Sequence, residues 1–320
     1  MSPPILVGYD PRSEDHAPVR FGMVVARFTG APLVVGIVES GASVIALSAG
    51  EEQPYAIGMH IDGDLMDNCS QAVEDVEAEV RAFGVHVDCV RVPSSSAARA
   101  IHEEAERRNA TLLVIGSSRR AESGRLKLGS TAARLIHGAP CPISVVPRDW
   151  MPDGDLATIG VGYSDSEEGR EAMRAAHALA RRSGATLRVI GVVRETLPIA
   201  LEAEAPAAGR RGKTVEDAEG EHMLALRRRI QADLQSLGEG PEVEVDVMAG
   251  DPADALIRAS RHLDLLVCGS RGYGPLRAVM LGSVSSRVAD EAQCPVLVLP
   301  RGVRASLDAL MESAPSAAAR

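Results

Sequence analysis

Short apolar runs alternate with amphipathic stretches along the 320-residue chain. The runs are rich in Val, Ile and Leu, which is typical of strands that are buried on both faces of a sheet. In the first half of the chain they cover residues 5–9, 33–38, 85–92, 112–115 and 143–146. In the second half they cover residues 159–163, 187–193, 243–247, 265–268 and 296–299.

Between these runs, apolar residues recur at helical spacing. Helices are therefore expected at about residues 13–28, 73–83 and 97–108, from 130, after 166, at 226–237 and from 252. Asp251 is expected to cap the last of these, with Pro252 in its first position. Strands that alternate with helices predict an α/β fold, and we expect two tandem, doubly wound, parallel five-stranded sheets.

Two glycine-rich loops, each directly after an apolar run, repeat at an interval of 153 residues. The second loop has the pattern Gly-x2-Gly-x9-Gly-Ser, formed by Gly269, Gly272, Gly282 and Ser283, and the first loop matches it at Gly116, Gly129 and Ser130. A Cys-Pro pair before the last apolar run of each half keeps the same interval. This duplication predicts two domains, at residues 1–148 and 156–302, a linker at 149–155 and a tail at 303–320.

The glycine loops suggest an anion site. A glycine at the end of a strand lets the backbone pass close to a ligand, because no Cβ is in the way. Consecutive backbone N–H groups in such a turn form a concave site for an anion. Ser283 is expected to cap the following helix, whose free N–H groups also favour phosphate.

Composition and charge limit the classes of partner that the protein is expected to bind. The formal net charge is −10 and aromatic residues make up only 2% of the chain, which disfavours a nucleic-acid partner. No apolar run approaches 18 residues and the first residues do not read as a signal peptide, so we expect a cytoplasmic protein without a membrane partner. The five cysteines lack Cys-x-x-Cys spacing and the histidines do not cluster, so neither disulfides nor a metal site are expected.

The order and duplication of these motifs resemble the universal stress protein family in its tandem form, over residues 4 to about 302. The resemblance also includes the strand–Gly–Tyr–Asp start that ends at Asp10 and the Gly-Asp-Pro turn that begins at Gly250. It implies an adenine nucleotide alpha hydrolase-like, Rossmann-like fold and a site for ATP, ADP or AMP, with Mg²⁺ as an accompanying ion. Carried over by position, the nucleotide-binding residues are Asp10, Val38, Gly116, Gly129, Ser130 and Thr131 in the first half, and Val192, Gly269, Arg271, Gly272, Gly282, Ser283 and Val284 in the second.

Each half departs from the family pattern at a different place. The first half has Arg119 where the second glycine of the loop should be, and residues 94–96 are serines in place of Gly-Asp-Pro. The second half keeps every glycine but has Ser164 in place of the aspartate. The basic residues of the first loop (Arg119, Arg120, Arg125 and Lys127) fit two interpretations equally. They form a solvated loop, or they attract phosphate where the glycine turn is lost.

We therefore expect a regulator or sensor of the stress response that binds an adenine nucleotide and has no strong catalytic activity. The sequence offers no nucleophile beside a base, no metal cluster and no carboxylate pair. Two alternatives remain: an ATP-consuming enzyme such as a slow ATPase, and an interaction module that binds no nucleotide.

The closing apolar runs of the two halves predict how the halves meet. Residues 143–146 and 296–299 are short, uncharged and expected at the edge of each sheet. An uncovered apolar edge pairs readily with another strand. We expect these two runs to pair within one chain as an intramolecular pseudo-dimer, and pairing of whole chains into a homodimer through other surfaces stays open.

Overall fold

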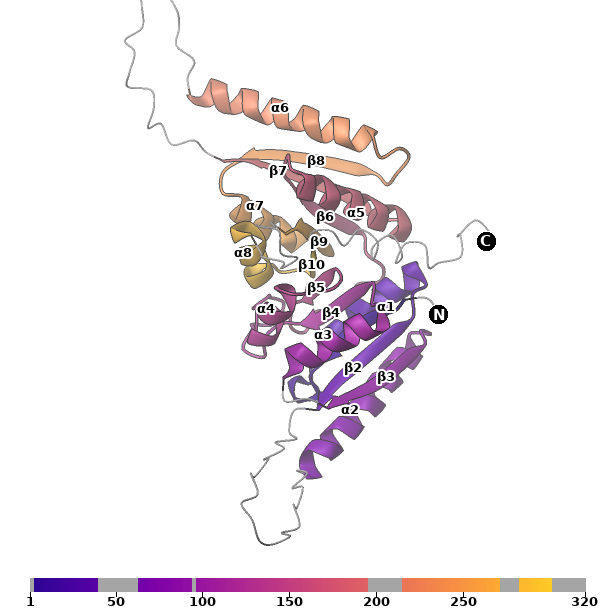
Figure 1. Ribbon diagram of the computed structural model, residues 1–320. Helices are drawn as coiled ribbons and strands as arrows, with labels where there is room; N and C mark the ends of the chain where they lie inside the picture. Colours follow the sequence, from indigo (N-terminus) through magenta and orange to yellow (C-terminus); the bar gives the residue numbers. More distant parts are fainter. Residues whose placement is uncertain (1–2, 40–62, 94–95, 195–214, 271–281, 301–320) are drawn as a thin grey trace, which may run out of the picture.

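The computed structural model of the chain describes residues 3–39, 63–93, 96–194, 215–270 and 282–300. These residues contain one ten-stranded sheet with the order β3-β2-β1-β4-β5-β10-β9-β6-β7-β8 (Figure 1). The strands are β1 (Ile5–Tyr9), β2 (Leu33–Glu39), β3 (Val87–Pro93), β4 (Leu112–Gly116), β5 (Ile143–Val146), β6 (Thr158–Tyr163), β7 (Thr186–Val193), β8 (Val243–Ala249), β9 (Leu265–Gly269) and β10 (Val296–Leu299). Each lies where an apolar run predicts it, with ends that match or differ by at most two residues.

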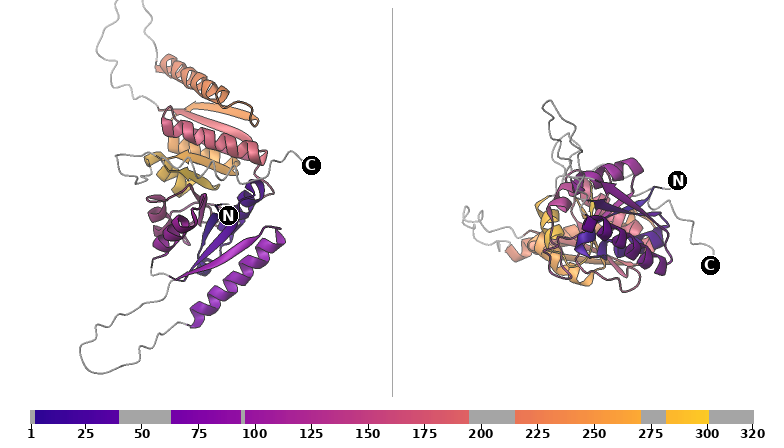
Figure 2. Two further views of the ribbon diagram at one scale, coloured as in Figure 1. Left: turned by 45° about the vertical axis from the view of Figure 1, so that its right-hand side comes forward. Right: turned by 90° about the horizontal axis from the view of Figure 1, so that it is seen from below.

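The helices cover both faces of this sheet. They are α1 (Ala17–Thr29), α2 (Gly63–Ala82), α3 (Ala97–Arg108), α4 (Ser130–Ile136), α5 (Glu167–Ser183), α6 (Val215–Gln235), α7 (Pro252–Ala259) and α8 (Ser283–Glu291), with the short 3-10 turns η1 (Pro11–Ser13) and η2 (Ser260–His262). Figure 2 shows α2 and α6 at opposite ends of the sheet. None of the helices in the described part of the chain is long and apolar enough to cross a membrane.

Two apolar cores form because successive strand residues point to opposite faces. One core packs α1, α2, α5 and α6 against the sheet and contains Ile5 and Val7 of β1. The other packs α3, α4, α7 and α8 and contains Leu6 of the same strand. Neighbouring strands within each half are parallel, so each half is a doubly wound sheet, as predicted.

The two halves join through their closing strands. β10 pairs with β5 in the antiparallel direction, with Val296 opposite Val145 and Val298 opposite Ile143. The prediction that residues 143–146 and 296–299 dock the halves is therefore confirmed. Helices α1 and α5 strengthen the same seam on one face, where Arg182 Nε donates to the Phe28 carbonyl oxygen at 3.0 Å.

The structure corrects four helix starts. Helices α2 and α6 begin at Gly63 and Val215, well before the expected ranges 73–83 and 226–237. Helix α1 begins at Ala17 and not near residue 13, because Asp10 caps the turn Pro11–Ser13 and Glu14 then adopts φ 53°, which interrupts the helix. Ser283 is the first residue of α8 and not its cap, since Gly282 occupies the capping position. Asp251 caps α7 as predicted, by accepting from the Asp254 N–H at 3.0 Å. Most of the long connections at 39–64 and 194–214, and the tail at 303–320, lie outside the described residues.

Candidate functional site

A cavity of about 650 Å³ lies at the carboxyl ends of β1 and β4. The strand order reverses here, because β2 and β4 flank β1 on opposite sides. Such a switch point is where open α/β sheets bind ligands. All six residues that the sequence assigns to the first-half site line this cavity: Asp10, Val38, Gly116, Gly129, Ser130 and Thr131.

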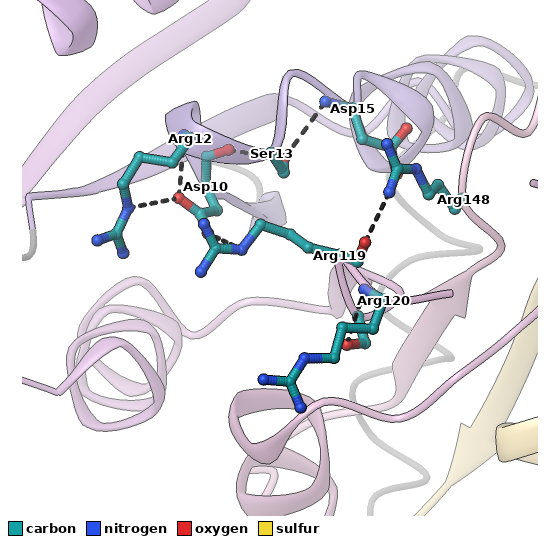
Figure 3. Close-up of polar contacts among 8 residues, drawn as sticks. Asp10, Arg12, Ser13, Asp15, Arg119, Arg120 and Arg148 are labelled. Carbon is teal, nitrogen blue, oxygen red and sulfur yellow. Dashed lines mark hydrogen bonds and ion pairs between the residues drawn. The ribbon is translucent and has the colours of Figure 1, made fainter. Parts of the chain in front are cut away.

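Asp10 lies between two arginines at the mouth of β1 (Figure 3). Its Oδ1 accepts from the backbone N–H and from Nε of Arg12, at 3.1 and 3.3 Å. Its Oδ2 lies 4.0 Å from Nε of Arg119, the residue that replaces the second loop glycine. The Asp10 carboxylate therefore holds both guanidinium groups at the edge of the cavity.

Four cationic side chains line the cavity together with two carboxylates. Arg12, Arg119, Arg120 and Lys127 are the cations, and Asp10 and Asp15 are the carboxylates. Arg12 was missed by the sequence reasoning; its position two residues after Asp10, in a turn that Asp10 caps, is the signal that could have found it. This local excess of positive charge contrasts with the net charge of −10 for the whole chain.

The first glycine loop is held by its own hydroxyl groups. Ser117 Oγ accepts from the Lys127 N–H at 2.7 Å and donates to the Lys127 carbonyl oxygen at 3.0 Å. The Ser118 N–H donates to that same oxygen at 2.8 Å. Arg148 donates to the Arg119 carbonyl oxygen at 2.6 Å, as Figure 3 shows. Hydrogen bonds therefore fix the basic loop at both of its ends and at the Arg119 carbonyl group.

Asp15 is a second carboxylate of the cavity that the sequence reasoning missed. It is buried and accepts from the backbone N–H groups of Ala17 and Asp149, at 3.0 and 3.3 Å. Burial raises the pKa of its carboxyl group above the ordinary value, although the two backbone hydrogen bonds oppose this shift. Asp15 therefore serves the start of α1 and the linker as much as the cavity.

Apolar side chains form another part of the lining. Val38, Ile101, Ile115, Leu128 and Leu135 border the cavity and belong to, or pack against, the core on that face of the sheet. Tyr9 borders it too, and burial together with nearby carboxylates raises the pKa of its hydroxyl to about 12. The cavity thus combines an apolar portion with a cationic rim.

The strand-end glycines have a packing role that differs from the expectation. A Cβ on Gly116 would lie 2.9 Å from Cγ of Pro18 in α1. A Cβ on Gly269 would lie 2.8 Å from the backbone oxygen of Glu168 in α5. Both distances are too short for real Cβ contacts, so these glycines allow the strand and the first helix of each half to approach closely.

The second-half residues are only partly placed. Arg271 and Gly272 lie outside the described residues. Gly269 ends β9, and Ser285 Oγ donates to its carbonyl oxygen at 2.8 Å, which places the first turn of α8 beside this strand end. The other assigned residues that the structure describes are Val192 on β7, Gly282 as the cap of α8, and Ser283 and Val284 in its first turn.

The aspartate position of the second half carries different chemistry. Ser164 Oγ lies 3.0 Å from Ser166 Oγ, the hydroxyl that caps α5. The next residue, Asp165, forms ion pairs with Arg170, at 2.8 Å, and with Arg229. The described residues contain no group of three His, Cys, Asp or Glu side chains that could hold a metal ion.

Comparisons with known proteins identify the family. The model of the universal stress protein family matches residues 1–147 and 156–300. A universal stress protein of Mycolicibacterium smegmatis is 28% identical over 305 residues, which cover 92% of this chain and 96% of that protein. One of Mycobacterium tuberculosis is 26% identical over 297 residues, with the same coverage.

Solved structures agree on the fold. A universal stress protein from Archaeoglobus fulgidus superimposes with a TM-score of 0.60 at 20% identity, covering 93% of this chain and 98% of its own. A putative universal stress protein from Pseudomonas aeruginosa gives 0.64 at 18% identity, covering 97% and 98%. With two family matches in tandem over one shared sheet, this chain belongs to the universal stress protein family.

Proposed function

We propose that the first-half cavity binds an adenine nucleotide, with ATP as the favoured form. The observation that carries this proposal is that six residues assigned from the sequence line one cavity. They lie at or just after the ends of β1, β2 and β4 and at the start of α4. Its volume of about 650 Å³ falls within the usual range for small-molecule sites, about 300–1,000 Å³.

The cationic rim supports an anionic ligand. Arg119 stands where the family loop has its second glycine, and Arg12, Arg120 and Lys127 add three further positive charges. Asp10 offsets part of this charge through its contacts with Arg12 and Arg119. The Asp15 carboxylate, the other acidic group of the lining, instead accepts hydrogen bonds from two backbone N–H groups. Hydrogen bonds from charged donors to phosphate are strong, so these side chains can replace the contacts of the lost glycine turn.

The apolar lining supports a base at the other end of the ligand. Val38 is the second-last residue of β2, and Ile101 and Ile115 lie on α3 and β4. Together they form an apolar surface, and burial of a planar ring against such a surface is favourable because both lose contact with water. An adenine base against this surface and phosphates against the arginines would satisfy both parts of the cavity.

The same site gives little support for fast hydrolysis, so we propose a regulator or sensor of the stress response. Of the two lining carboxylates, Asp10 contacts Arg12 and Arg119, and Asp15 accepts from two backbone amides. A pKa of about 12 keeps the Tyr9 hydroxyl protonated at neutral pH, so it does not serve as a base. A Mg²⁺ ion that accompanies ATP would take most of its ligands from phosphate and water, and Asp10 is the lining carboxylate that is not buried.

We extend the proposal to the second half from its loop sequence. Its loop keeps Gly269, Gly272 and Gly282, and Arg271 supplies a cation in the same loop. Val192, Ser283 and Val284 would complete the site, as Val38, Ser130 and Thr131 do in the first half.

Calorimetric titration with ATP tests the proposal, with Arg119→Gly as the decisive variant. This change restores the family glycine but removes a cation, and we expect it to weaken ATP binding by about tenfold, since a hydrogen bond to a charged group contributes about 1.5–3 kcal/mol. Arg125→Gly is the matched control, because Arg125 lies in the same loop but does not line the cavity. It should change the affinity less than twofold.

Two outcomes would replace the proposal by an alternative. If native mass spectrometry of freshly purified protein shows no nucleotide and calorimetry shows no uptake of ATP, the chain is an interaction module without a nucleotide. If ATP is hydrolysed steadily at more than ~1 per second, the lower end of ordinary enzyme turnover, the chain is an ATPase.

A further inference from the structure

A contact between the halves reaches the rim of the first-half cavity. Residues 126–128 of the first loop lie against the end of α8, a helix of the second half. The Lys127 ammonium donates to Asp290 Oδ2 at 2.9 Å, and the Leu128 N–H donates to Asp290 Oδ1 at 2.8 Å. The Leu126 N–H donates to the Ala292 carbonyl oxygen at 2.8 Å, directly after α8 ends.

These bonds fix the part of the loop that enters the site. Lys127 and Leu128 both line the cavity, and the lining residues Gly129, Ser130 and Thr131 follow without a gap. The inner side of Lys127 is held by Ser117, whose Oγ accepts from its N–H. Asp290 holds the outer side, and both of its carboxylate oxygens are used in doing so. The contact also raises the pKa of the Lys127 ammonium, which therefore stays charged when a phosphate binds.

The reverse contact has no charged equivalent in the sequence. At the repeat interval of 153 residues, Lys127 corresponds to Met280 and Asp290 corresponds to His137. Methionine offers no ammonium group, so the sequence does not repeat the Lys127–Asp290 pair at the equivalent positions. The residue pair itself is therefore specific to the first loop.

We propose that Asp290 is a positioning residue of the first-half nucleotide site, so that the docked second half sets the affinity of the first. This inference rests on the proposed function. Asp290 holds the Leu128 backbone and the Lys127 ammonium in the conformation that meets the phosphates. Because binding linkage is reciprocal, a nucleotide in the first-half cavity in turn stabilises the contact with the end of α8.

Simple electrostatics predicts the opposite result, which makes the inference testable. Removing a negative charge near a phosphate site should strengthen binding through Coulomb attraction alone. Loss of a positioning contact should weaken it, because the Leu128 N–H loses its acceptor and the loop gains freedom. The neighbouring Glu291 carries the same charge on the same helix turn, and its carboxylate lies 3.8 Å from Nε of Arg287. Glu291→Ala is therefore the matched control for Asp290→Ala.

The experiment is a titration of the full-length variants with ATP, followed by hydrogen–deuterium exchange of peptides that span residues 112–131. This readout reports the first half separately from the second. We expect Asp290→Ala to weaken ATP binding about tenfold and Glu291→Ala to change it less than twofold. Asp290→Asn keeps an oxygen acceptor for Leu128 and should lose less than threefold. In wild type, ATP should also slow exchange at residues 286–292, and this protection should disappear in Asp290→Ala.

The outcomes separate this inference from the nucleotide proposal. An unchanged or higher ATP affinity in Asp290→Ala, or an equal loss in Glu291→Ala or Asp290→Asn, would overturn the positioning role. If the wild-type first half shows no ATP-dependent protection, the nucleotide proposal fails instead. The ATP-free exchange of residues 126–131 then still decides the inference: faster exchange in Asp290→Ala than in Glu291→Ala supports positioning, and equal exchange refutes it.

Discussion

After β1 the chain makes the turn Pro11–Ser13 and starts α1 only at Ala17, whereas after β6 helix α5 starts at Glu167, directly behind its cap Ser166. The first connection carries Asp10 and Arg12 to the rim of a cavity. At the same place the second half has Ser164, and Asp165 pairs with Arg170 and Arg229 of its own half. Equivalent strands in the two halves are therefore followed by different arrangements of charged side chains.

The two halves of this duplicated chain share the features that packing requires. The two strand-end glycines are both required by a close helix, and the strands of both halves keep the same pairing order. Residues that point beyond the strand ends are not held by packing, so their chemistry can diverge without a cost to the fold. In the first half this divergence has assembled cations around one cavity.

Separation of the two halves should have the largest effect on stability. Val298 is fully buried in β10 opposite Ile143, so Val298→Lys places an unpaired charge in the seam. We expect a loss of about 4 kcal/mol or more in the free energy of unfolding, together with proteolysis at residues 149–155. Urea denaturation measures it, with the exposed Leu224→Lys as the control that should change by less than about 0.5 kcal/mol. An unchanged midpoint in Val298→Lys would mean that the seam contributes little.

The two strand-end glycines should differ in how much stability is lost when each is replaced by alanine. The added Cβ of Gly269→Ala meets a backbone oxygen, which cannot move aside, whereas that of Gly116→Ala meets the Pro18 ring. We expect the first change to cost about 2–3 kcal/mol and the second about 1 kcal/mol, within the range for overpacked sites. Gly220→Ala, in open space on α6, should instead stabilise by up to about 1 kcal/mol. Denaturant midpoints decide the order, and equal losses at both strand ends would contradict the packing explanation.

The smallest expected effect concerns Asp15, whose counterpart in the second half is Gly169 at the interval of 154 residues that also aligns Asp10 with Ser164. Burial raises the pKa of Asp15 above its ordinary value of 3.8, so the folded protein holds this proton more tightly than the unfolded chain. Its contribution to stability is therefore fully present below pH 3.8 and is lost as the pH rises through the raised folded pKa. Asp15→Asn keeps an acceptor for the Ala17 N–H but does not titrate.

The free energy of unfolding of wild type minus that of Asp15→Asn should therefore fall across this window and then level off. Thermal unfolding at a series of pH values measures the difference. A difference that rises with pH would show that hydrogen bonding to the carboxylate outweighs its burial.

The sequence alone predicted the strands, the duplication and six residues that line the first-half cavity. Apolar runs predict buried parallel strands because both faces of such a strand lose water, and the repeat interval aligned the two loops without a structure. Asp10, Gly116 and Gly129 could be grouped because strand ends at a switch point meet at one edge of the sheet. The closing strands could be matched because uncharged edges need a partner.

Tertiary structure alone decided the chemistry around those residues. Arg12 and Asp15 reach the cavity through a local turn that helical periodicity does not reveal, since Glu14 adopts a left-handed conformation there. Asp290 meets Lys127 across 163 residues, and only the antiparallel pairing of β5 with β10 brings them together. Gly116 proved to be a packing glycine because its neighbour, Pro18, comes from a different element. Contacts between distant elements depend on how helices pack on the sheet, which local sequence patterns do not specify.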